Sequence, residues 1–512
     1  MGTSAVSVAV SVAADWGTGR TMDLVITNTG KQALSTWSVT MPWSGTSIEM
    51  WNANATLSGG KLTAANAGWN GALAPGASTS VGFNDAGALV SPSTCTSIVD
   101  GRAAACSIKG AGSGSSPTPT ATPTPTPTAT PTPTPTGPAL VGSKKVIGYY
   151  PGWATYARNY QVSDIPGNKV SHLNYAFANI AGGKCVLGDS YADTDKAFAG
   201  DTWDTGVLRG NFNQLIKLRN ANPALKTLIS IGGWTWSANF SAAAASDASR
   251  QAFASSCVDF MKQYKFDGID IDWEYPVSGG LQSGAPEDKQ NFTLLLKELR
   301  VQMNAKEATD NRDYFLTIAA PAGPSVISNL EVKAVGDTLD WINLMTYDYH
   351  GGWDPMTGHN APMVQGARDP GPKGFAIKDT VNSYLTAGVP ASKLVLGVPF
   401  YGRGWQQVAE TNGGLFQSGT GAGVGTWENG VFDYTDIKAN YLPTMQRYWD
   451  SEAQVPYLYD RARGLFISYD DPQSMKIKAD YINAMGLGGA MIWELSGDRN
   501  AELLDALNTT LN

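Results

Sequence analysis

Phe266-Asp-Gly-Ile-Asp-Ile-Asp-Trp-Glu274 stands near the middle of a chain of 512 residues. The two β-branched isoleucines favour a strand, on which successive side chains point to opposite faces. Asp270, Asp272 and Glu274 therefore share one face, with neighbours roughly 6 to 7 Å apart at Cα. Like charges this close raise the pKa of one carboxyl, so we expect the trio to hold at least one proton near neutral pH.

The last acid of this trio is the expected proton donor. Catalytic groups of a parallel barrel lie at the carboxyl ends of its strands. Glu274 stands at such an end, because Tyr275-Pro276 and a Gly279-Gly280 turn follow it. A solvated acidic strand is the alternative, and the apolar residues that alternate with the acids disfavour it.

Metal and histidine chemistry find little support in the sequence. The chain has no HExxH motif, no EF-hand spacing and only three histidines. His350 and His359 have no serine elbow or other evident partner, so we expect them to be loop residues. We predict neither a metal nor a cofactor.

Strands alternate with amphipathic runs over residues 142–512. The eight predicted strands are 146–150, 172–177, 227–231, 266–274, 315–319, 341–345, 394–398 and 489–493. This order predicts a (β/α)8 TIM barrel. The segment from about 404 to 465 is too long for one helix, and we expect a small α+β insertion there that adds a wall to the cleft.

The N-terminal part has a different organisation. Residues 1–109 show short alternating strands separated by turn signals, which predicts an all-β sandwich. Residues 110–141 form a Gly/Ser and Pro-Thr linker. Its prolines favour an extended polyproline II form, about 3.1 Å per residue, which makes it a semi-rigid spacer.

Composition limits the class of partner. A formal charge of -8 argues against nucleic acid or an anionic membrane surface. Sixteen Trp and twenty Tyr suit a neutral partner that has both apolar and polar faces, such as a sugar. The chain has no run of about 18 apolar residues, so we predict no transmembrane helix.

The four cysteines fall into different settings. Cys95 and Cys106 lie close together at the end of the first domain, where a disulfide is plausible in an oxidising compartment. Cys257 falls on an apolar stripe at helical spacing, which predicts a buried thiol. Cys185 lies in a predicted loop and is not assigned.

The central motif resembles the DGxDxDxE signature of the family 18 glycoside hydrolases, the chitinases. Further family motifs stand at 230–233, 345–348 and 491–494. The resemblance implies a barrel that hydrolyses β-1,4-linked N-acetylglucosamine polymers with retention of configuration. Two other functions share the pattern. One is a non-hydrolytic chitin lectin, which would normally have lost Glu274, and the other is an endo-β-N-acetylglucosaminidase acting on protein-linked glycans.

The resemblance also implies roles for individual residues. In this family the substrate's own acetamido oxygen attacks the anomeric carbon, so the protein orients that group instead of supplying a nucleophile. Glu274 would be the acid and later the base, and Asp272 would hold the acetamido N–H. Asp270 would share a proton behind it, and Tyr347 would donate its hydroxyl to the acetamido oxygen.

Further matches line the expected cleft. Asp348 would bond the sugar at the cleavage point, and Trp493 would form the floor of that subsite. Ser230 and Tyr149 match positions that support the innermost carboxylate. Arg403 matches an arginine on the substrate side of the cleft. Trp234 and Trp353 match tryptophans that stack sugars on the leaving side. Met345 belongs either to the core or to the wall of a subsite.

The first domain resembles the family 2 carbohydrate-binding modules. The matching segments are 15–19, 26–30 and 69–71, with Cys106 as the closing cysteine. The family usually pairs an N-terminal cysteine with the last one. Val6 occupies that place here, which leaves Cys95 as a substitute partner.

The exposed tryptophans of that family carry over onto Trp16, Trp51 and Trp69. Core packing is the alternative for any one of them, and Trp37, between strand residues, is expected in the core. The predicted partners are chitin and N-acetylglucosamine oligosaccharides, with cellulose as another target of the module. We expect a secreted, extracellular monomer, in a processed or recombinant form.

Overall fold

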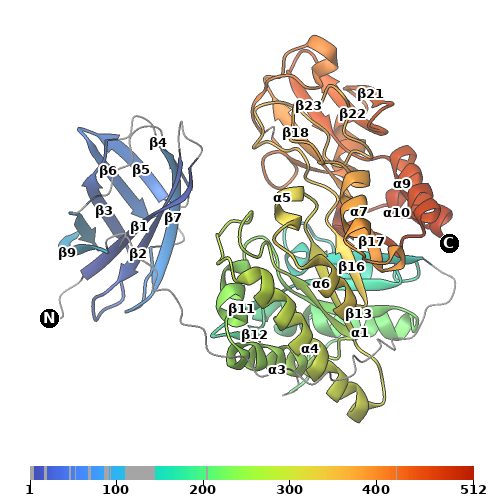
Figure 1. Ribbon diagram of the computed structural model, residues 1–512, viewed down its shortest axis with the longest axis horizontal. Helices are drawn as coiled ribbons and strands as arrows, with labels where there is room; N and C mark the ends of the chain where they lie inside the picture. Colours follow the sequence, from blue (N-terminus) through green and yellow to red (C-terminus); the bar gives the residue numbers. More distant parts are fainter. Residues whose placement is uncertain are drawn as a thin grey trace, which may run out of the picture. The chain divides into compact units, whose positions relative to one another are not determined.

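The computed structural model describes residues 5–15, 20–44, 48–51, 53–66, 71–85, 92, 94–109, 144–202, 204, 206–422 and 424–512. The chain forms two compact units, each with its own core (Figure 1). No helix among these residues is long and apolar enough to cross a membrane.

The N-terminal unit is the predicted all-β sandwich. Its strands are β1 (Ala5–Asp15), β2 (Arg20–Asn28), β3 (Trp37–Pro42), β4 (Ile48–Trp51), β5 (Ala53–Ser58), β6 (Lys61–Asn66), β7 (Ser78–Asp85), β8 (Thr96–Val99) and β9 (Arg102–Lys109). They pair in the order β4-β7-β2-β1-β9-β8-β3-β6-β5. Side chains along β3 alternate between buried and partly exposed, and Trp37 is 1% exposed, which confirms its place in the core.

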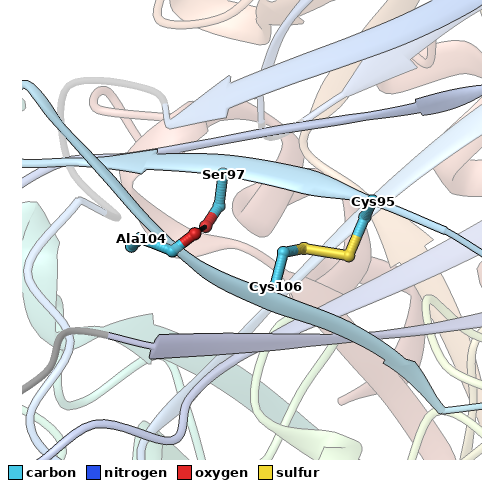
Figure 2. Close-up of a disulfide and its surroundings, with 4 residues drawn as sticks. All are labelled: Cys95, Ser97, Ala104 and Cys106. Atoms are coloured by element: carbon cyan, nitrogen blue, oxygen red, sulfur yellow. Dashed lines mark hydrogen bonds between the residues drawn. A yellow bond between two sulfur atoms is a disulfide. The ribbon is translucent and has the colours of Figure 1, made fainter.

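A disulfide closes the β8–β9 hairpin (Figure 2). Cys95 and Cys106 are bonded, with their Cα atoms 5.6 Å apart, as the sequence indicated. Beside it, Ser97 Oγ donates to the Ala104 carbonyl at 3.1 Å. Val6 lies opposite Cys106 in the parallel β1–β9 register, so the family's usual N-terminal cysteine would stand next to this bridge.

The C-terminal unit is a closed parallel barrel, as predicted. Its strands are β10 (Lys145–Pro151), β11 (His172–Ala181), β13 (Lys226–Gly232), β14 (Gly268–Asp272), β15 (Phe315–Ala320), β16 (Trp341–Leu344), β17 (Leu394–Pro399) and β24 (Gly489–Trp493). Neighbours pair in parallel and β10 joins both β11 and β24, which closes the ring. β12 (Lys184–Val186) extends β11 as a hairpin.

Helices accompany these strands. They are α1 (Gly210–Ala221), α2 (Phe240–Ala244), α3 (Asp247–Gln263), α4 (Asp288–Asp310), α5 (Pro324–Ile327), α6 (Val332–Thr338), α7 (Ile377–Thr386), α9 (Pro472–Met485) and α10 (Glu502–Leu511). Cys257 is buried on α3, as its apolar stripe predicted, and Cys185 on β12 is buried too.

In the sequence, a small sheet and the short helix α8 (Tyr434–Asp436) come between β17 and β24. Its strands are β18 (Tyr401–Gln406), β19 (Thr420–Ala422), β20 (Val431–Asp433), β21 (Gln446–Asp450), β22 (Val455–Asp460) and β23 (Leu465–Ser468). They form the α+β insertion, and Trp405 and Phe466 pack in its core. The sheet runs from Tyr401 to Ser468, slightly wider than the 404–465 segment predicted, because β18 and β23 pair at its base.

Candidate active site

The acidic strand delivers its carboxylates to the barrel interior. All of β14 is buried, and Ile269 and Ile271 join the large core cluster while Asp270 and Asp272 take the opposite face. The strand ends at Asp272. Glu274 lies two residues beyond this end, where its backbone N–H donates to Ser237 Oγ at 2.8 Å.

Asp270 accepts hydrogen bonds from four other barrel strands. Tyr149 Oη and Ser230 Oγ donate to Oδ2 at 2.6 and 2.7 Å, and Thr317 Oγ1 and Asn343 Nδ2 donate to Oδ1. Burial raises the pKa of Asp270, and these hydrogen bonds oppose that rise. Thr317 and Asn343 were not predicted as site residues, although a polar residue inside an otherwise apolar strand is a signal that could have found them.

Asp272 is also buried, but its hydrogen bonding differs from that of Asp270. Its Oδ1 is buried without a hydrogen-bond partner among the described residues. Burial raises the pKa of Asp272 well above the ordinary range, and the charges of Glu274 and Asp270 raise it further. The neutral form of Asp272 is therefore favoured, with an oxygen that a ligand can bond.

Glu274 is poised to donate a proton near neutral pH. Burial raises its pKa to about 7, a hydrogen bond from Tyr275 opposes this, and the charge of Asp348 adds to it. A carboxyl that titrates near the working pH suits both acid and base steps. Tyr275, the residue directly after Glu274, was expected only to mark the end of the strand.

A clamp of three polar side chains lies beside the trio. Arg403 binds both oxygens of Asp348, and Tyr401 Oη donates to Asp348 Oδ1 at 2.7 Å. Asp348 adopts a left-handed backbone conformation, φ +58°, and Asn360 Oδ1 accepts its N–H at 2.9 Å. Since Tyr401 and Arg403 come from β18, the small sheet supplies part of the site. Arg403 had been expected to face substrate, and here it is paired with Asp348.

Apolar and aromatic side chains pack together near the acids. Trp493, the last residue of β24, stacks on Phe177 with ring centroids 5.8 Å apart. Tyr347 Oη lies 3.8 Å from Met491 Sδ. Burial raises the pKa of Tyr347 well above its ordinary value, so its hydroxyl stays protonated as a donor. Met345 packs in the same cluster and is buried.

Two hollows are lined by residues that the sequence predicted for the site, and the trio contributes to the first of them. Glu274, Tyr275 and Trp234 line the first. Trp493 and Arg403 line the second, with Trp153, Arg158, Trp427 and Glu494 among its other residues. Trp234 is 47% exposed and Trp353 is 61% exposed, so both rings are open to a ligand. The module residues Trp16 and Trp69 and the Trp51 side chain lie outside the described residues.

One group of the second hollow was not predicted from the sequence. Arg158 Nη1 donates to Glu494 Oε1 at 2.7 Å, and its guanidinium lies 5.6 Å from the Trp427 ring. Trp427 Nε1 in turn donates to Asp433 at 2.8 Å. Glu494 is the last residue of the 491–494 motif, so this motif could have identified it as a site residue. Nothing near Trp427 in the sequence points to its contact with Arg158.

The two histidines considered earlier do lie in loops, but both are buried and paired. His350 contacts Asp354 and Asp369, and His359 Nε2 lies 3.1 Å from Asp450. Two of their three acidic partners, Asp369 and Asp450, are 19 and 91 residues away in sequence, which explains why these two were not evident.

Known proteins share this organisation. Residues 145–498 match the family model described as Glycosyl hydrolases family 18, and residues 6–121 match the one described as Cellulose binding domain. Chitinase A1 of Niallia circulans is 48% identical over 410 residues, which cover 72% of this chain and 58% of that protein. Chitinase C of Streptomyces lividans is 35% identical over 94% of this chain and 89% of its own length. The structure of chitinase ChiA74 from Bacillus thuringiensis superposes with a TM-score of 0.70 at 42% identity, covering 72% of this chain and 70% of that one.

Proposed function

Because the chain belongs to glycosyl hydrolase family 18, we propose that it is a chitinase that hydrolyses the β-1,4 glycosidic bonds of chitin and N-acetylglucosamine oligomers. The observation that carries this proposal is the electrostatic difference within the trio. Burial raises the pKa of Glu274 to about 7, while the buried Asp272 favours its neutral form and has one oxygen without a hydrogen-bond partner among the described residues. Such a pair fits one proton donor beside a group that orients substrate.

The reaction follows from these roles. Glu274 protonates the leaving oxygen as the acetamido oxygen of the substrate attacks the anomeric carbon and the glycosidic bond breaks. Asp272 bonds the acetamido N–H, and the protonated Tyr347 hydroxyl donates to the acetamido oxygen. Glu274, now ionised, takes a proton from water, which opens the cyclic intermediate with net retention. Asp270 stays behind Asp272 as the buried end of the trio.

The cleft around the trio supplies the binding positions. Trp493 is proposed as the floor beneath the sugar at the cleavage point, and Asp348 as its hydrogen-bond partner. The exposed rings of Trp234 and Trp353 are proposed to stack sugars on the leaving side. Arg403 acts through Asp348, because its guanidinium is committed to that carboxylate.

The N-terminal unit is proposed to hold the enzyme on an insoluble polysaccharide, either chitin or cellulose. The Cys95–Cys106 disulfide supports an oxidising, extracellular location.

The test uses chitin oligomers that carry either an acetamido group or a free amine on the sugar whose anomeric carbon is attacked. Only the acetylated sugar should be cleaved at its glycosidic bond, and the first product seen by NMR should be the β-anomer. An α-anomer as the first product, equal cleavage beside free amines, or a covalent glycosyl adduct on Asp272 would exclude substrate assistance.

A further inference from the structure

A buried histidine, His350, lies in the same loop as Trp353. His350 is 5% exposed, with Nδ1 3.0 Å from Asp354 Oδ2 and Nε2 3.2 Å from Asp369 Oδ2. A neutral imidazole has only one N–H, so it can donate to only one of two carboxylates. Donation to two ionised carboxylates therefore requires the doubly protonated, cationic ring.

The two carboxylates are themselves held by the backbone. The N–H of Gly351 donates to Asp354 Oδ2 at 3.2 Å, and the N–H of Gly371 donates to Asp369 Oδ1 at 2.7 Å. Among the described residues, these two aspartates are the charged groups that face the ring. Burial lowers the pKa of His350, but the hydrogen bonds and charges of Asp354 and Asp369 outweigh it and raise that pKa to about 9.

This cluster fixes a tight turn with an exposed tryptophan at its corner. The N–H of Asp354 donates to the Gly351 carbonyl at 2.9 Å, and the Asp354 carbonyl accepts from Trp405 Nε1 at 3.2 Å. A Cβ on Gly351 would lie 2.3 Å from the Trp353 ring, so the ring packs directly on this glycine. The guanidinium of Arg403 lies over the same ring, 4.9 Å from its centroid.

We propose that His350 is a positioning residue for substrate binding: as a cation held between Asp354 and Asp369, it fixes the turn that orients the Trp353 ring toward a sugar. The inference deepens the proposed function and rests on it, since Trp353 is given its sugar-stacking role there. A purely structural His350 would stabilise the fold without a specific link to Trp353.

A double-mutant cycle separates these two roles. We would measure kcat and KM on the N-acetylglucosamine hexamer for His350→Asn, Trp353→Ala and the double variant. His350→Asn should raise KM about three- to tenfold, comparable to the loss of one aromatic contact, with kcat within about twofold. The double variant should be no worse than Trp353→Ala alone.

Asp340→Asn is the matched control. Asp340 pairs with Arg300 at the amino end of β16, and the carboxyl end of that strand leads to the turn. This variant should lower the melting temperature and leave KM unchanged. If His350→Asn does not fold, Asp369→Asn takes its place in the same cycle. Additive effects in the double variant, or an unchanged KM in the single variant, would overturn the proposal.

A binding measurement keeps the result independent of turnover. In a Glu274→Gln background, calorimetry with the hexamer should show affinity falling as pH rises through about 9, because His350 then loses a proton and one carboxylate contact. The same titration with Trp353→Ala should be flat over this range. A pH-independent affinity would contradict the inference. Wild-type enzyme that fails to cut the hexamer would refute only the proposed function.

Discussion

Arg403 binds both carboxylate oxygens of Asp348, through Nε at 2.7 Å and Nη2 at 2.6 Å. The pair joins β18 of the small sheet to the loop after β16 of the barrel. Two parallel hydrogen bonds fix the plane of the Asp348 carboxylate relative to the plane of the Arg403 guanidinium. The charge of Asp348, which acts on Glu274, is therefore held in a single orientation.

This arrangement predicts a pH effect of Asp348→Asn. The charge of Asp348 raises the pKa of Glu274, so its removal should lower that pKa below about 7. Since the acid must be protonated to act, the alkaline limb of the kcat/KM profile should move to lower pH. An alkaline limb that stays in place or moves upward would contradict the electrostatic link.

Glu274→Gln should abolish proton donation while keeping the shape of the site. We expect kcat to fall at least 10²- to 10⁴-fold, and the affinity for oligomers to stay within a few-fold. Wild-type activity should itself decline as pH rises through about 7, where the acid loses its proton. Steady-state kinetics and calorimetry check both parts, and activity within tenfold of wild type would remove Glu274 from its role.

The donors of Asp270 can be tested with a matched pair of tyrosines. Tyr149 and Tyr384 are both fully buried and each donates one hydrogen bond, Tyr149 to the Asp270 carboxylate and Tyr384 to the Pro321 carbonyl at 2.8 Å. Tyr149→Phe should cost about 1.5–3 kcal/mol of unfolding free energy and Tyr384→Phe about 0.5–1.5 kcal/mol, because bonds to charged groups are stronger.

Activity separates these two variants further. Tyr149→Phe should also lower kcat, since the loss of one donor raises the pKa of Asp270 and alters the charge behind Asp272. Tyr384→Phe should leave kcat unchanged. Equal losses of stability and activity in both variants would show that the Asp270 network has no special role.

Removal of residues 1–136 tests the N-terminal unit. The rate on short soluble oligomers should barely change, because every proposed catalytic group lies in the C-terminal unit. The rate on dilute insoluble chitin should fall, since the module raises the local concentration of enzyme at the surface. A truncated enzyme that matched the full chain on insoluble chitin would refute a chitin-binding role.

Point substitutions in the module refine this test. Replacing Trp16, Trp51 and Trp69 together by alanine should reproduce the truncation while the module stays folded. Trp37→Ala should instead unfold the module, because this side chain is 1% exposed and its loss leaves a large cavity costing about 3–5 kcal/mol. Circular dichroism of the module distinguishes the two outcomes.

Local sequence was enough to predict that Asp270 and Asp272 share one face of their strand. Strand alternation has a period of two, so the common face of Asp270 and Asp272 follows from local geometry alone. The order of eight strands, the burial of Trp37 and Cys257, and the Cys95–Cys106 pairing were also predictable. Each depends on residues close in sequence or on a periodic pattern.

The contact partners of these side chains could be identified only in the folded protein. Thr317 and Asn343 reach Asp270 across 47 and 73 residues, and Arg403 reaches Asp348 across 55, contacts that no local pattern encodes. The His350 cluster depends on Asp369 in the same way. The pKa of Glu274 rises because closure of the barrel buries part of its side chain, and burial is a property of the folded chain rather than of a motif.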